Sequence, residues 1–215
     1  MQVVVAKSPE KLNRYISAVK SNKFFIFLLS VLIAGMLSGA LAVKGMGDTV
    51  DALLNAWFRS FLSFRLSAGF WKIFFNCFLT GFIYMTVIGL SAFGVSGMAV
   101  LPCLMFFRGF GTCMLAGFLY RNYSLQGIAF ADLIILPSCL VADFLLLYAS
   151  GKAMELSKRF FDCLRDVSAR GVILKPQCVD LLKKILRCTL IFVVVSLAES
   201  AFTVCFIKYF NFAWN

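Results

Sequence analysis

Apolar runs long enough to cross a lipid bilayer dominate this chain. A transmembrane helix needs about 20 consecutive, mostly apolar residues. Stretches that meet or nearly meet that length are residues 24–43, 72–93, 98–119, 127–149 and 188–209. Of the 215 residues, 61% are hydrophobic, whereas soluble domains carry roughly half. The sequence therefore predicts an all-α integral membrane protein with five transmembrane helices, which form a single membrane domain over residues 24–215.

Two further segments are predicted to be amphipathic helices. Residues 1–23 form a cytoplasmic N-terminal tail, in which Ser8-Pro9-Glu10 is typical of a helix start. Residues 50–66 are predicted to lie in the outer membrane interface, with Trp57 near the headgroups. A short helix packed on the spans is the alternative, and the two do not exclude each other. The apolar stripe of this segment has helical spacing and comprises Val50, Leu53, Leu54, Trp57, Phe58, Phe61 and Leu62.

The distribution of Lys and Arg predicts the orientation. Positive residues gather in the N-terminal tail and in the 150–187 loop, and five spans place these two segments on the same side. The N-terminus and the basic, partly helical loop are therefore predicted to be cytoplasmic, and the C-terminus outside. A signal peptide over the first span, with Ala40-Leu41-Ala42 as cleavage site, is disfavoured because the apolar run is too long. The opposite side has few basic residues: Lys44, Arg59, Arg65, Lys72, Arg121 and Lys208.

The residue types also exclude several functions. The chain contains no histidine, which removes Ser-His-Asp and Cys-His catalytic arrangements and the commonest metal ligand. Its eight cysteines show no CxxC spacing, so neither a metal site nor a cofactor is predicted. The net charge is +11, and the basic residues that produce it flank the spans. This position indicates contact with membrane lipid rather than with nucleic acid. We expect no enzymatic activity.

Ionisable residues inside the spans are costly and each needs a partner or a function. By a rise of about 1.5 Å per residue, Arg108 and Glu199 lie roughly 15 and 16 Å from the cytoplasmic ends of their spans. The sequence therefore predicts that they pair. Asp132 and Asp143 lie about three turns apart on one face of the fourth span, which Pro137 is expected to bend. This carboxylate stripe either serves proton or cation movement, or simply reaches water or Arg108 from the two membrane interfaces.

Small residues recur at the spacing that lets membrane helices pack closely. Gly35 and Gly39 form a GxxxG motif in the first span, and Gly109, Cys113 and Gly117 recur every four residues in the third. Packing within one chain is favoured over packing between copies, and the oligomeric state stays open.

Several short motifs together resemble the stage II sporulation protein M family of bacterial membrane proteins. They follow one another in order between about Phe24 and Thr203. The stretches that carry the resemblance are Phe74-Phe75-Asn76, the glycine-rich segment from Phe107-Arg108-Gly109 to Gly117-Phe118, the start at Gly127, Leu136-Pro137 and Leu197-Ala198-Glu199-Ser200-Ala201-Phe202-Thr203. Many relatives carry a polar residue directly after this proline and an acidic one soon after, for which Ser138 and Asp143 are approximate equivalents.

The resemblance implies a non-enzymatic scaffold in the bacterial cell membrane. Family members of the spore-forming type hold two peptidoglycan-cleaving partners, sporulation proteins D and P, at the division septum during engulfment of the forespore. An alternative from the residues alone is a small transporter or permease subunit, in which Arg108, Asp132, Asp143 and Glu199 line a polar path.

Overall fold

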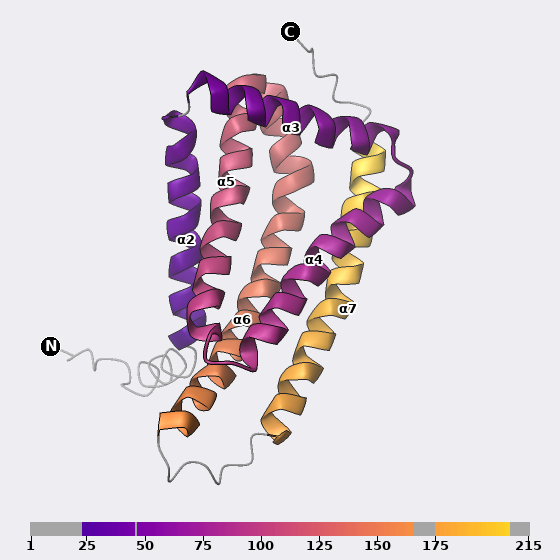
Figure 1. The fold of residues 1–215 in the computed structure, drawn as a ribbon. Helices are drawn as coiled ribbons and strands as arrows, with labels where there is room; N and C mark the ends of the chain where they lie inside the picture. The colour runs from indigo at the N-terminus through magenta and orange to yellow at the C-terminus, as the bar shows by residue number, and fades with distance from the viewer. Residues whose placement is uncertain (1–22, 46, 166–174, 207–215) are drawn as a thin grey trace, which may run out of the picture.

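Helices account for all regular structure in the computed structural model, which describes residues 23–45, 47–165 and 175–206. Five segments of these helices are long and apolar enough to cross a membrane. The predicted all-α membrane fold is therefore confirmed (Figure 1). The helices in chain order are α2 (Lys23–Lys44), α3 (Asp48–Ser67), α4 (Phe70–Ala92), α5 (Gly97–Phe130), the π-helical turn η1 (Ala131–Ile135), α6 (Leu136–Arg165) and α7 (Lys175–Phe206).

The helices extend beyond the apolar runs that predict them. The fourth span continues to Arg165 and the fifth begins at Lys175, because Lys, Glu, Arg and Leu in these extensions favour helix. The N-terminal end of α2, the end of α6 and the start of α7 lie at one end of the bundle, and α3 lies across the other (Figure 1). A chain with five spans requires the start of its first span, the end of its fourth and the start of its fifth to lie on the same side. The orientation and the domain division stay predictions, and the amphipathic tail falls almost entirely outside the described residues.

The third and fourth spans form a hairpin without a loop. The hydroxyl of Tyr120 donates a hydrogen bond of 2.5 Å to Asp132, although the two residues are 12 positions apart. A straight helix would separate them by about 18 Å. The chain therefore reverses within this interval, where a Cβ on Gly127 would collide with the carbonyl oxygen of Leu119. The reversal brings α5 and α6 side by side (Figure 1).

The fourth span departs from α geometry directly before Pro137. The π-helical turn η1 ends two residues before this proline, which has no N–H to donate to the preceding turn. The hydroxyl of Ser138 donates instead to the carbonyl oxygens of Ile134 and Ile135, at 3.4 and 3.0 Å. The disturbance predicted at Pro137 therefore takes the form of a widened turn.

The glycines of α2 and α5 face each other within the chain. A Cβ on Gly35 or Gly39 would collide with the backbone oxygen of Phe106 or Phe110, and one on Gly109 would collide with that of Leu32. The two helix backbones are thus in direct contact, as small residues permit in a membrane. Gly117 lies farther along the same interface, where a Cβ would come within 3.1 Å of the Val43 side chain.

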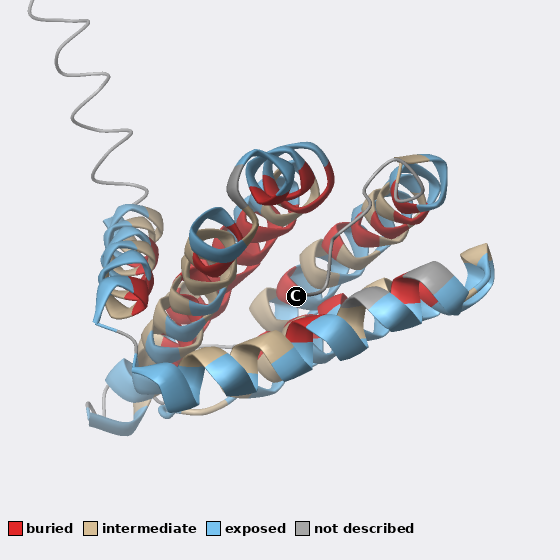
Figure 2. Cartoon of the chain, turned by 90° about the horizontal axis from the view of Figure 1, so that it is seen from above, coloured by how far each residue is buried: buried red, intermediate tan, exposed pale blue. Residues whose placement is uncertain are grey.

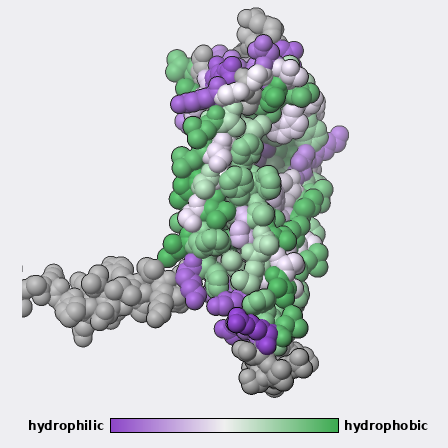
Figure 3. Space-filling model, turned by 60° about the vertical axis from the view of Figure 1, so that its left-hand side comes forward, coloured by the Kyte–Doolittle hydropathy of each residue, from purple (hydrophilic) through white to green (hydrophobic). Residues whose placement is uncertain are grey.

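The helix α3 packs across the end of the hairpin. Phe58 is 0% exposed and its ring contacts the rings of Phe118, Tyr123 and Phe130. Trp57 is 52% exposed and stacks on Phe61. The helix therefore packs on the spans and also presents an exposed aromatic side chain. Its place in the outer membrane interface stays a prediction. Buried residues face inward on each helix (Figure 2), and the face drawn in Figure 3 is mostly apolar over its middle, with polar residues gathered toward its two ends.

Candidate functional site

A cavity of about 590 Å³ lies beneath α3, between α4 and α7 on one side and the α5–α6 hairpin on the other. Apolar and aromatic side chains form part of its wall, including Phe61 and Phe64 of α3 and Phe192 of α7. Polar groups converge on it from α3, α4, α5 and α7: Arg65, Asn76, Thr80, Tyr84, Arg108 and Glu199. Polar side chains gathered inside a transmembrane domain mark this cavity as the candidate site.

The first charged pair at the cavity joins α3 to α7. Nη2 of Arg65 lies 2.6 Å from Oε1 of Glu199, and Nη1 donates a 3.0 Å hydrogen bond to the hydroxyl of Thr203. The same Nη2 lies 3.7 Å from the sulfur of Cys77 on α4, and the guanidinium lies 4.6 Å from the ring centre of Phe61. Arg65 is only 8% exposed. One arginine therefore links three helices at the edge of the cavity.

The second charged pair lies within the α5–α6 hairpin. Nε of Arg108 lies 2.7 Å from Oδ1 of Asp143, which is 3% exposed. Nη2 of the arginine lies 3.8 Å from the sulfur of Cys139, and its guanidinium is 5.4 Å from the ring centre of Tyr84. The other carboxylate oxygen, Oδ2, is buried without a hydrogen-bond partner among the described residues. The contact is thus made through a single oxygen.

The predicted pairing of Arg108 with Glu199 is wrong. Both side chains line the same cavity, so the estimate of their depth was sound. Depth does not identify the neighbour, however. The hairpin places Asp143 directly beside Arg108, and α3 folds back over the bundle to supply Arg65 as the partner of Glu199. Arg108 and Glu199 therefore each have a partner on a different helix from the one that the predicted pairing gave them.

The remaining predicted polar residues occupy different places. Asn76 lines the cavity, whereas Asp132 is exposed near the hairpin bend and bonds to Tyr120. Asp132 and Asp143 do not line the cavity together, so the predicted carboxylate stripe is not a continuous polar surface. Asp143 does reach Arg108, which was the simpler of the two interpretations.

Arg65 lines the cavity but was not a predicted site residue, because the sequence places it among the basic residues of the outer side. A signal was present in its spacing. Arg65 follows Phe58 by seven residues and Phe61 by four, which places it on the same helical stripe. That stripe faces the bundle. No cluster of three or more Cys, Asp or Glu residues that could hold a metal ion occurs in the part of the chain that the structure describes.

Comparison with known proteins adds no relative: no family model, curated protein or solved structure matches the chain. The arrangement of five spans, one transverse helix and an internal polar cavity therefore rests on the chain's own geometry.

Proposed function

We propose that this multi-pass membrane protein is a non-enzymatic scaffold for a septal peptidoglycan-degrading complex needed for engulfment during sporulation. The resemblance to the stage II sporulation protein M family is the source of this specific role and of its expected partners, sporulation proteins D and P. The bacterial cell membrane is the corresponding location. Five spans and their apolar surface support contact with membrane lipid.

The ion pairing of the charged side chains at the cavity, all within the chain, carries the proposal. Three charged side chains line the cavity among the described residues, and each has an ion-pair partner in the same chain. Such pairs connect helices and neutralise buried charge, which is a structural role. A conducting path would instead need several accessible carboxylates placed one after another along it. Neither Asp132 nor Asp143 lines the cavity.

Deletion of the gene in a spore-forming host tests the scaffold. Septal membranes are imaged during spore formation, with a wild-type copy restored as control. A septum that forms while engulfment stalls supports the proposal, and normal engulfment removes it. Restoring the double variant Arg65→Leu/Glu199→Leu sharpens the test, because a scaffold that accumulates normally should restore engulfment without these charges.

A transporter is the second candidate, and the size and polar lining of the cavity favour it. The test is proton or cation flux into proteoliposomes that contain the purified chain. Flux that disappears in Glu199→Gln at unchanged protein amount would support transport. Absence of flux in the wild-type chain at several ion gradients would exclude the transporter. Together with stalled engulfment in the deletion strain, it would support the scaffold.

A further inference from the structure

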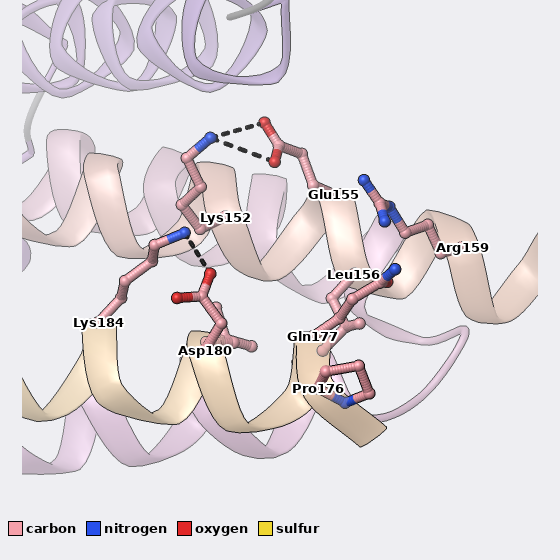
Figure 4. Close-up of a pocket in the computed structure, with 9 residues that line it drawn as sticks. Lys152, Glu155, Leu156, Arg159, Pro176, Gln177, Asp180 and Lys184 are labelled. Atoms are coloured by element: carbon pink, nitrogen blue, oxygen red, sulfur yellow. Dashed lines mark hydrogen bonds and ion pairs between the residues drawn. The ribbon is translucent and has the colours of Figure 1, made fainter. Parts of the chain in front are cut away.

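A second pocket, of about 280 Å³, lies between α6 and α7 at the end of the bundle opposite α3 (Figure 4). Lys152 is the first charged residue of α6 after Asp143, and Lys184 lies one turn before the apolar run of α7 begins. The pocket thus occupies the level at which lipid headgroups meet a transmembrane helix. Its charged and polar lining consists of Lys152, Glu155, Arg159, Gln177, Asp180 and Lys184.

The cations of this pocket are available to an anionic ligand. Lys152 bonds to Glu155 at 3.0 Å and Lys184 to Asp180 at 2.6 Å, each one turn away on the same helix and partly exposed. Pairs of this kind hold their partners weakly. Arg159 is exposed and forms no ion pair with any described residue. Three cations therefore face two loosely held carboxylates.

A buried acceptor on a residue that lines this pocket indicates what else the ligand carries. The Oε1 atom of Gln177 is buried without a hydrogen-bond partner among the described residues. Buried polar atoms are nearly always paired, so this oxygen calls for a donor. A phosphate diester bound by Lys and Arg supplies no donor, whereas hydroxyl groups on the alcohol that it esterifies do.

An apolar groove adjoins this pocket. A space of about 180 Å³ between α2 and α6 is lined by Phe25, Tyr148 and Gly151, and it shares Lys152 and Glu155 with the charged pocket. A headgroup beside Lys152 therefore has an adjacent apolar surface for an acyl chain. A soluble phosphate ester would make no use of this groove.

We propose that the α6–α7 pocket binds the phosphate and glycerol hydroxyls of an anionic lipid headgroup, as in phosphatidylglycerol. Arg159, Lys184 and Lys152 bind the phosphate, and the Gln177 side chain turns toward the pocket so that its oxygen accepts a hydrogen bond from a glycerol hydroxyl. This site is distinct from the cavity beneath α3 and does not depend on the scaffold role.

Lipid titration of the full chain, purified in neutral detergent and followed by native mass spectrometry, tests the site. One molecule of phosphatidylglycerol should bind at least about tenfold more tightly than phosphatidylcholine. The variant Arg159→Gln/Lys184→Gln should lose most of that preference. Its matched control is Lys183→Gln/Arg187→Gln, which removes the same charge from exposed positions of α7 that do not line the pocket. Equal losses in the two variants would mean diffuse attraction and overturn the pocket.

Two further measurements separate the parts of the proposal. Gln177→Leu should reduce the preference for phosphatidylglycerol over phosphatidic acid, whose phosphate carries no glycerol headgroup. An unchanged preference would overturn the role of the hydroxyl. Soluble glycerol 3-phosphate should compete only at concentrations at least a hundredfold higher than the lipid. Competition at equal concentration would identify a soluble phosphate ester, rather than a lipid, as the ligand.

Discussion

The two sides of the bundle are held together in different ways. On the α2 side, Gly35 and Gly39 bring the backbone of α2 into direct contact with that of α5. On the α3, α4 and α7 side, the helices surround a cavity of about 590 Å³. There the ion pair of Arg65 with Glu199 links α3 to α7 at the edge of this cavity.

This difference separates two sources of stability in a membrane. Lipid tails are as apolar as the side chains they touch, so helices associate through close packing and through polar contacts. The α2 side associates through close packing and the cavity side through polar contacts. We therefore expect the two sides to respond in opposite ways to added volume and to removed charge.

Breaking the Arg65–Glu199 pair should have the largest effect. Glu199→Leu leaves the guanidinium of Arg65 buried with only Thr203 and Cys77 as neutral acceptors. Removing one partner of a buried pair costs about 3–5 kcal/mol. The free energy of unfolding, measured by reversible denaturation in mixed micelles, should fall by that amount.

The double variant Arg65→Leu/Glu199→Leu should be more stable than either single variant, because no charge is then left unpaired. Glu199→Gln serves where the leucine variant does not accumulate, since it keeps the shape of the side chain. Additive losses in the double variant would contradict the pairing of Arg65 with Glu199.

Adding a methyl group on the α2 side should have the next largest effect. Gly35→Ala and Gly39→Ala place a Cβ against backbone oxygen atoms of α5, which cannot rotate away. Overpacking of this kind costs about 1–3 kcal/mol. The matched control is Gly111→Ala on α5, where a Cβ would meet nothing within 4 Å. Unfolding measurements should show the control unchanged or slightly stabilised, since Ala favours helix. Equal effects at the three positions would remove the distinction.

The same substitution beside the cavity should be better tolerated. A Cβ on Gly81 would collide with the ring of Phe192, and both residues line the cavity. The obstacle is a side chain with space beside it, so the ring can turn into the cavity and the cost should lie at the low end of about 1–3 kcal/mol. Gly81→Ala should therefore lower the free energy of unfolding less than Gly35→Ala does. The opposite order would show that the cavity side is as tightly packed as the α2 side.

The spans were predictable because the bilayer imposes their length. Each apolar run of about 20 residues had to become a helix, since lipid satisfies no backbone polar group. The GxxxG motif likewise indicated close contact, because only small residues permit it. Both inferences use local patterns, and the structure places α2 and α5 accordingly. The reversal between the third and fourth spans, predicted at 98–119 and 127–149, was expected from the sequence, but its completion without a loop was not.

The charge pairs could not be read from local patterns in the same way. Arg65 lies three residues beyond the last apolar residue of the predicted stripe. To recognise it as inward-facing, one has to extend the stripe by one helical turn. Asp143 was placed nearer the membrane interface than Arg108, yet the length of the arginine side chain bridges an offset of roughly one turn. Which helix lies beside which depends on packing, and depth along each helix gives no information about it.

The smallest expected effect is the coupling energy between Arg108 and Glu199. It is also the sharpest check on which charges are partners. Both line the cavity, but each is paired elsewhere, Arg108 with Asp143 and Glu199 with Arg65. A double-mutant cycle with Arg108→Leu and Glu199→Leu should therefore be additive within about 0.5 kcal/mol, as expected for residues without a shared contact. The cycle of Arg108→Leu with Asp143→Leu is the positive control and should show a coupling several times larger. If the Arg108–Glu199 cycle showed the larger coupling, the two charges would pair across the cavity, and the cavity would be narrower than the ion pairs at its walls imply.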